Sequence, residues 1–252
     1  MRAAPGRIFA PPFPDGARWL NVAMVRMDQQ LGRPVLVEFF DVCRVPSLRT
    51  LPYVQAWDRR YPELRVVSVH TPGYELSADE ELVASSVQRL GISHAVLLDH
   101  RGELWQRYGN RGWPGRYLWD QRGTLVDLHY GEGAYADTEE AIRELLELPG
   151  GDVIAPLRPE DDPQATIAAP TPEQEGAFCG DYVGGGVWVV ASGRGTLAVN
   201  GSAYEVTYDG AHQLIDHGEH TEAALVLEPG DGVTVHATVF TPGVVRSPVP
   251  EP

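Results

Sequence analysis

The sequence contains no lysine, and its 20 basic residues, all arginine, are outnumbered by 35 aspartates and glutamates. The absence of lysine excludes mechanisms that need a lysine amine, such as Schiff-base catalysis and the phosphate-binding loop of P-loop proteins. The resulting net charge of −15 argues against binding to nucleic acid or to an anionic membrane surface. We therefore expect no nucleic-acid partner.

Cysteine is almost as scarce, since Cys43 and Cys179 are the only two in the chain. Two cysteines are too few for a scaffold stapled by disulfides. They also fall in different predicted domains, and a bridge requires Cα atoms within about 7 Å of each other. A disulfide between them is left as a minor alternative.

Long apolar runs are absent as well. No run approaches the roughly 20 residues that span a bilayer, so we expect no membrane span. Residues 1–16 include a basic residue but no continuous apolar segment, which does not fit a secretory signal. The default expectation is a cytoplasmic location.

The first part of the chain alternates between two hydrophobic patterns. Strand patterns occur at 35–40, 65–70, 95–99, 116–120 and 124–130, and helical patterns at 45–60, 79–90 and 137–147. Such alternation predicts an α/β domain over residues 1–147, with a central mixed sheet and helices on both faces.

The composition changes after residue 147. Residues 148–176 contain six prolines and no sustained periodicity, which is typical of a linker. Short β-rich runs then follow, separated by glycine-containing turns, at 187–192, 195–200, 203–208, 212–217, 222–228 and 233–240. They predict an antiparallel β-sandwich domain over 177–245, followed by a tail at 246–252.

Seven segments occur in an order that resembles one known family: WLN (19–21), GRPVLVEFF (32–40), SLRTLPYVQAW (47–57), VVSVHTPGYE (66–75), LGISHAVLLD (90–99), YGNRGWPGRYLWD (108–120) and GEGAYADTEEAIRELL (131–146). The chain resembles the soluble C-terminal part of DipZ-type thiol–disulfide exchange proteins, which are relatives of the TlpA and AhpC/TSA redoxins. The resemblance implies a thioredoxin-like fold, a cis proline at Pro114 and a second domain of the jelly-roll or carbohydrate-binding type. Because members of this group often work outside the membrane, an extracytoplasmic location is the alternative.

The family motif C-x-x-C is replaced in this chain. Counting from the matched segments on either side, Arg44 and Ser47 occupy the two cysteine positions, and Cys43 lies one residue too early. Disulfide exchange needs a thiolate of low pKa at a helix N-terminus and a second thiol that resolves the mixed disulfide. Neither replacement provides one, so we expect no dithiol oxidoreductase activity.

Two residues near this motif are candidate catalytic groups. Cys43 precedes the helix beside Arg44, where a thiolate would be stabilised, although the usual fate of a lone cysteine is to pack as a small hydrophobe. Glu38 lies where the family resemblance places a buried acid that relays protons. Without a disulfide above it, pairing of Glu38 with Arg44 or a neighbouring arginine is the plainer interpretation.

The same region also predicts a binding cleft. Its candidate residues are Arg44, Ser47, Trp113, Pro114, Gly115 and Arg116, with Arg49 and Arg111 nearby. Arginines at a helix N-terminus favour a protein segment, a peptide or a small anionic ligand. Their alternative role is pairing with surface acids. No cofactor is expected.

The second domain contains two weaker candidates. His212, His217 and His220 lie near Asp216 and Glu219, but the spacing matches no metal motif, and we expect no metal site. Four aromatics, Tyr182, Trp188, Tyr204 and Tyr208, fit either a sugar-binding platform or ordinary core pairs.

Three functions follow from these patterns. The first is a degenerate redoxin that binds a partner in the cis-proline cleft. The second is a single-cysteine redox enzyme or sensor that uses Cys43, and the third is a carbohydrate-binding or assembly module in the β domain. The sequence leaves open whether the chain is an enzyme and in which oligomeric state it works.

Overall fold

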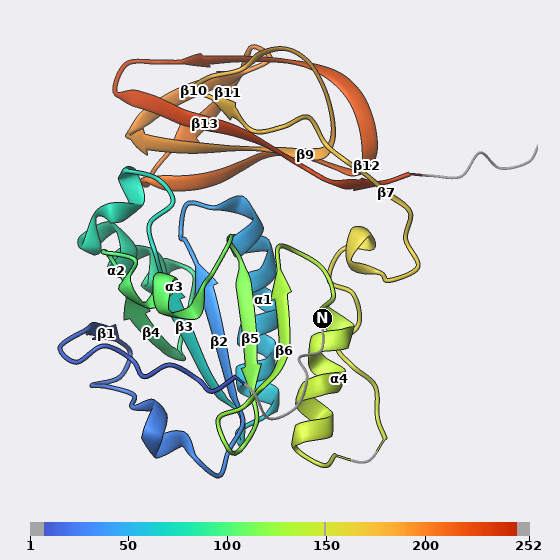
Figure 1. Ribbon diagram of the computed structural model, residues 1–252. Coiled ribbons are helices and arrows are strands. Elements are labelled where there is room, and N and C mark those ends of the chain that lie inside the picture. Colours follow the sequence, from blue (N-terminus) through green and yellow to red (C-terminus); the bar gives the residue numbers. More distant parts are fainter. Residues whose placement is uncertain (1–7, 149, 246–252) are drawn as a thin grey trace, which may run out of the picture. The chain divides into compact units, whose positions relative to one another are not determined.

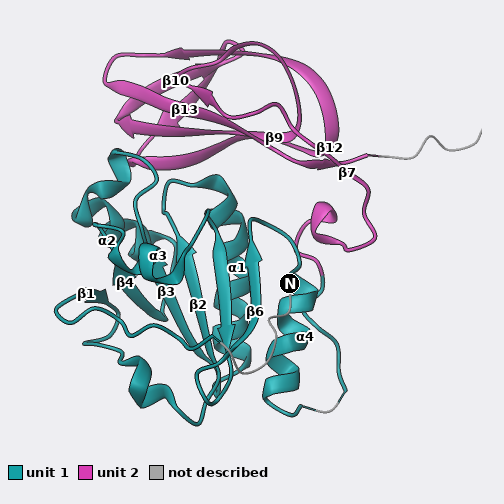
Figure 2. Ribbon diagram, viewed as in Figure 1, with its two compact units in different colours: residues 1–155 teal, residues 156–252 magenta. Residues whose placement is uncertain are grey.

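The structure is a computed structural model that describes residues 8–148 and 150–245 of the 252-residue chain. Two compact units, residues 1–155 and 156–252, make up the chain (Figure 2). No helix in the described part of the chain is long and apolar enough to cross a membrane. The predicted tail at 246–252 lies outside the described residues.

The first unit is built on a six-stranded sheet with the order β1-β4-β3-β2-β5-β6 (Figure 1). Strands β2, β3 and β4 are parallel, whereas β1, β5 and β6 pair in antiparallel fashion. The strands are β1 (Arg18–Leu20), β2 (Val35–Phe40), β3 (Arg65–His70), β4 (Ala95–Leu98), β5 (Gly115–Trp119) and β6 (Leu125–Tyr130). The predicted mixed sheet is confirmed.

Helices cover both faces of this sheet, as predicted. They are α1 (Val45–Arg60), α2 (Glu80–Arg89), α3 (Glu103–Tyr108) and α4 (Tyr135–Leu145), with short 3-10 turns η1 (Met27–Gln30) and η2 (Leu76–Ala78). Because side chains alternate along a strand, β2 contributes to two separate cores. Val35, Val37 and Phe39 pack with α3 and the N-terminal segment, whereas Leu36 packs with α1 and α4.

The second unit is an antiparallel β unit, which confirms the prediction of a β domain. Its six-stranded sheet has the order β11-β10-β12-β9-β13-β8, and β7 pairs with β14 in a separate two-stranded sheet. The elements are η3 (Pro159–Asp161), β7 (Ile167–Ala168), β8 (Gln174–Glu175), β9 (Cys179–Gly193), β10 (Gly195–Val199), β11 (Ser202–Val206), β12 (Gly210–Pro229), β13 (Val233–Thr241) and β14 (Gly243–Val244). The jelly-roll and carbohydrate-binding likeness stays a prediction.

Two details of the second unit differ from the expectation. The supposed linker 148–176 contributes β7 and β8, which pair with β14 and β13 and so belong to the second unit. The runs at 212–217 and 222–228 are one strand, β12, whose register against β9 shifts between Asp216 and Thr221. In β9 the chain needs a glycine at 185, because a Cβ there would lie 2.3 Å from the Pro242 carbonyl oxygen.

Glu139 of α4 is a buried carboxylate that ties three segments of the first unit together. It accepts hydrogen bonds from the Trp57 indole (3.2 Å), the Tyr61 hydroxyl (2.6 Å) and the Ile154 backbone N–H (2.8 Å). The Arg60 guanidinium lies 3.1 Å from the same carboxylate. Glu139 therefore fixes α4 and the chain after it against the last turns of α1.

We predict that Glu139→Gln lowers the free energy of unfolding by about 2 kcal/mol, because the amide loses the charge and turns an N–H group toward donors. Glu140→Gln, on the exposed side of the same helix, is the matched control and should change stability by less than about 0.5 kcal/mol. Urea unfolding measures both. Equal stability of the two variants would contradict the role assigned to Glu139.

Candidate functional site

The candidate site lies where β2 ends and α1 begins. The Asp41 side chain accepts hydrogen bonds that hold its loops in place. Its carboxylate accepts the Cys43 backbone N–H at 2.6 Å, and it also accepts the Gly73 N–H and the Ser77 hydroxyl. Asp41 thus joins the loop before α1 to the loop after β3. This role is not visible in the sequence, because Gly73 and Ser77 lie more than 30 residues from Asp41.

His70 at the end of β3 lies under the same carboxylate. Its Nε2 is 3.8 Å from Asp41 Oδ1, and both side chains are completely buried. Burial alone would raise the pKa of Asp41, but the nearby His70 imidazole, followed by the Cys43 N–H and the Ser77 hydroxyl, lowers it below its usual range. Asp41 is therefore a carboxylate that supports the loop from inside the protein.

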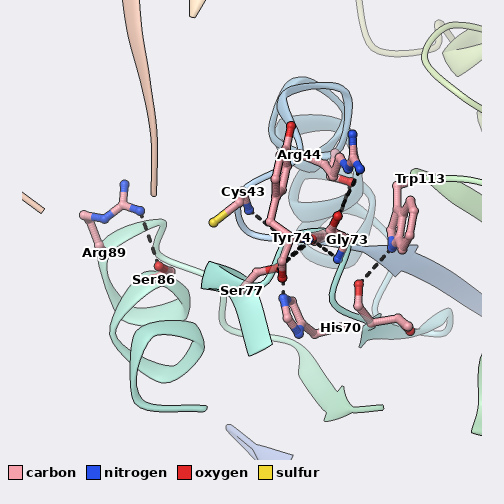
Figure 3. Close-up of polar contacts among 12 residues, drawn as sticks. Cys43, Arg44, His70, Gly73, Tyr74, Ser77, Ser86, Arg89 and Trp113 are labelled. Carbon is pink, nitrogen blue, oxygen red and sulfur yellow. Dashed lines mark hydrogen bonds and ion pairs between the residues drawn. The ribbon is translucent and has the colours of Figure 1, made fainter. Parts of the chain in front are cut away.

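Cys43 is fully buried in this loop. Its backbone N–H is held by Asp41, and its sulfur and the Arg44 guanidinium point away from each other (Figure 3). Cys43 and Cys179 do not form a disulfide. A buried thiol in this position is packed in the way that is common for a lone cysteine.

Arg44 is the N-cap residue of α1, and its side chain is only partly buried. The guanidinium donates a hydrogen bond to the Gly73 carbonyl oxygen at 3.0 Å. It lies 4.3 Å from the ring centre of Tyr74 and 5.4 Å from that of Trp113, both within cation–π range. We call Arg44, Tyr74 and Trp113 the Arg44 platform. Tyr74 was missed by sequence reasoning because it lies in a loop without periodicity.

The Trp113 side of the platform is firmly held. Its indole donates to the Thr71 carbonyl oxygen at 2.9 Å and packs on Trp105 with ring centres 4.3 Å apart. The Trp113–Pro114 peptide bond is cis. Pro114 itself is buried, so the part of this corner that reaches the surface is the partly exposed Trp113 ring.

Besides Pro114, three more residues expected to line the cleft are buried in the first unit. Ser47 is fully buried, and its hydroxyl accepts the Asp41 backbone N–H at 3.3 Å. Gly115 is buried at the start of β5. Arg116 is only 1% exposed and lies on the face of β5 that α1 and α4 cover. Its guanidinium stacks over Tyr135 at 4.9 Å and donates to the Gly133 carbonyl oxygen. The assignment of Arg116 to the cleft was therefore wrong.

Glu38 lies next to Arg116 in the sheet and is also fully buried. It accepts a hydrogen bond from the Ser68 hydroxyl at 3.0 Å. Burial raises the pKa of Glu38 to about 7, and the Ser68 bond and the Arg116 charge only partly offset that effect. Of the other arginines, Arg49 pairs with Glu132 at 2.8 Å, and Arg111 is exposed elsewhere on the domain.

Several of the candidate histidines and tyrosines of the second unit pack against one another. His212 is buried, stacks on Tyr208 with ring centres 4.0 Å apart and lies 3.3 Å from the Tyr204 hydroxyl. Tyr182 packs on Phe240 and bonds His217 at 2.8 Å. Within residues 8–148 and 150–245, no group of three histidine, cysteine or acidic side chains is arranged to hold a metal ion.

Comparison with known proteins gives one long alignment and several shorter ones. The chain is 30% identical to Protein DipZ of Mycobacterium tuberculosis over 237 aligned residues, which cover 85% of this chain and 34% of that protein. It is 27% identical to SUPPRESSOR OF QUENCHING 1, chloroplastic, of Arabidopsis thaliana, over 56% of this chain and 14% of that protein. It is 26% identical to thiol-disulfide oxidoreductase ResA of Halalkalibacterium halodurans, over 46% of this chain and 62% of that protein.

A solved structure agrees with the fold of the first unit. The thioredoxin-like superfamily protein SPOA0173 matches 56% of this chain and 97% of its own, with a TM-score of 0.52 and 21% identity. No protein-family model matches the chain. The chain spans about a third of the length of the mycobacterial DipZ relatives.

Proposed function

Because the chain is a thioredoxin-like redoxin related to the DipZ-type proteins, we propose that its first domain is a binding domain without dithiol exchange activity. The observation that carries this proposal is the Arg44 platform. An arginine occupies the position of the attacking cysteine, and it stacks on two aromatic rings at the domain surface.

The proposed ligand is an extended acidic segment of another protein. The Arg44 guanidinium supplies positive charge, and the partly exposed faces of Tyr74 and Trp113 supply apolar contact beside it. Guanidinium groups that stack on rings keep a fixed orientation, which favours recognition of a planar carboxylate. The first unit is nearly neutral, with 17 arginines and 20 acidic residues in 1–147, so its overall charge does not repel an acidic segment strongly.

The buried position of Cys43 supports the same proposal against the redox alternative. A reactive cysteine needs solvent access as well as a low pKa, and Cys43 has no exposed surface. The carbohydrate-binding alternative is weakened, because two of its four candidate aromatics, Tyr182 and Tyr204, pack against rings of the second unit. Neither alternative is favoured by a specific contact.

We predict that Arg44→Gln weakens binding of an acidic peptide about tenfold, because one partly buried, charge-assisted contact is lost. The measurement is fluorescence anisotropy with a labelled eight-residue peptide rich in glutamate. Arg59→Gln, an exposed arginine at the other end of α1, removes the same charge and should leave the affinity within twofold.

A neutral peptide of the same length tests the role of charge. It should bind the natural chain more weakly than the acidic peptide and should not distinguish Arg44→Gln from the natural chain. Equal affinities of Arg44→Gln and Arg59→Gln for the acidic peptide would contradict the proposal. Sulfate binding that depends on Arg44, without peptide binding, would identify a small anion as the ligand.

A further inference from the structure

The first unit contains a pocket that is separate from the Arg44 platform and shares no residue with it. Its volume is about 540 Å³, within the range of small-molecule sites. Strands β5 and β6, helix α3 and the segment before β1 form its walls. The lining residues with aromatic rings are Phe9, Tyr108, Tyr117, Trp119 and Tyr130.

Hydrogen bonds hold these walls in place. The Tyr117 and Tyr130 hydroxyls are 2.8 Å apart, and Tyr117 also bonds Asn110 Oδ1 at 3.1 Å. The Leu125 N–H donates to the Ile8 carbonyl oxygen at 3.0 Å, which fixes the N-terminal segment against the β5–β6 hairpin. These bonds order the pocket walls from within the protein, which lowers the entropic cost of binding a ligand.

The charge of the pocket is positive, although the chain as a whole is strongly acidic. Arg107 and Arg111 both line it, and no acidic residue does. Glu103 lies 3.9 Å from Arg107 and neutralises part of that charge, whereas Arg111 is exposed at the edge of the pocket. An anionic group entering here would be attracted mainly by Arg111.

We propose that this pocket binds a small flat apolar molecule that carries one anionic group. The apolar body lies among the aromatic rings, and the anionic group lies by Arg111 and Arg107. Phe9 lines the pocket and is 67% exposed, so it lies at the edge of the pocket.

The test uses 8-anilinonaphthalene-1-sulfonate, an aromatic anion whose fluorescence rises in apolar sites, with the full chain. We expect one saturable site per chain. Arg111→Gln should raise the dissociation constant roughly three- to fivefold, whereas Arg59→Gln should not change it. The neutral probe N-phenyl-1-naphthylamine should bind the natural chain and Arg111→Gln equally.

A second pair of variants locates the probe. Phe9→Ala should weaken both probes roughly fivefold, and Ile167→Ala, an exposed apolar residue of the second unit, should weaken neither. Binding that does not saturate, or that responds equally to Arg111→Gln and Arg59→Gln, would overturn the proposal. A dimer that excludes both probes in sedimentation experiments would overturn it too, because a second copy would then be the occupant.

Discussion

The double variant Arg44→Cys/Ser47→Cys is expected to reduce the disulfides of insulin, whereas the natural chain is expected to have no measurable rate. The two positions lie on the first turn of α1, at the N-cap and the third helical residue. A thiol at the N-terminus of a helix has a lowered pKa because the helix dipole stabilises the thiolate. We expect a gain on the order of a hundredfold over the natural chain.

The local structure suits both replacements. Ser47 is fully buried, and cysteine differs from serine only in the sulfur atom, so the packing is little disturbed. Arg44 is partly exposed, so a cysteine there can reach a substrate. Its removal also uncovers the Tyr74 and Trp113 rings, which widens the surface beside the new thiol.

Single variants provide the controls. Arg44→Cys alone should form a mixed disulfide with the substrate and stop, because no second thiol resolves it. Ser47→Cys alone should be inactive. Adding Cys43→Ala to each variant keeps the natural cysteine out of the exchange. If the double variant forms its internal disulfide but never reduces insulin, a feature of this surface other than residues 44 and 47 prevents the exchange.

The fold of the first unit was predictable because its central strands are mostly apolar. All six residues of β2 are buried, and runs of this kind mark the centre of a sheet. Helix α3 was missed because six residues are too few to show helical periodicity. Strands β7 and β8 are two residues each, and they can be identified only from their pairing with strands that are distant in the sequence.

The site was less predictable because its contacts come from distant loops. Arg44 and Tyr74 are 30 positions apart, and no local pattern links them. The error at Arg116 has a simpler cause. Residues 116 and 118 share one face of β5, and Leu118 belongs to the core under α1, so strand alternation places Arg116 inside the domain.

Glu38→Gln is expected to remove one pH-dependent contribution, a loss of stability as pH rises, from the unfolding free energy of the natural chain. The lowered pKa of His94 contributes in the opposite direction in both chains. Between pH 4 and pH 8 the unfolding free energy of the natural chain should fall by about 3 kcal/mol relative to that of Glu38→Gln. The reason is that burial raises the pKa of Glu38 from an ordinary 4.5 to about 7.

The direction follows from proton binding. Between these two pKa values the folded chain holds a proton on Glu38 that the unfolded chain has released, so folding loses free energy as pH rises. The loss begins near pH 4.5 and is complete above pH 7. A glutamine cannot ionise and has the same shape, so the unfolding free energy of Glu38→Gln does not fall in this way. The lowered pKa of Asp41 acts at lower pH in both chains and cancels in the difference.

Urea unfolding at one-unit pH intervals measures the effect, and Glu140→Gln, exposed on α4, is the control whose curve should run parallel to that of the natural chain. Curves that run parallel for Glu38→Gln as well would mean that Glu38 has the same pKa in the folded and unfolded chains, because the Arg116 charge offsets the effect of burial. Arg116→Met separates these cases. Without that charge the pKa of Glu38 should rise further and the loss should extend above pH 7, because Arg116 is one of the two groups that lower this pKa.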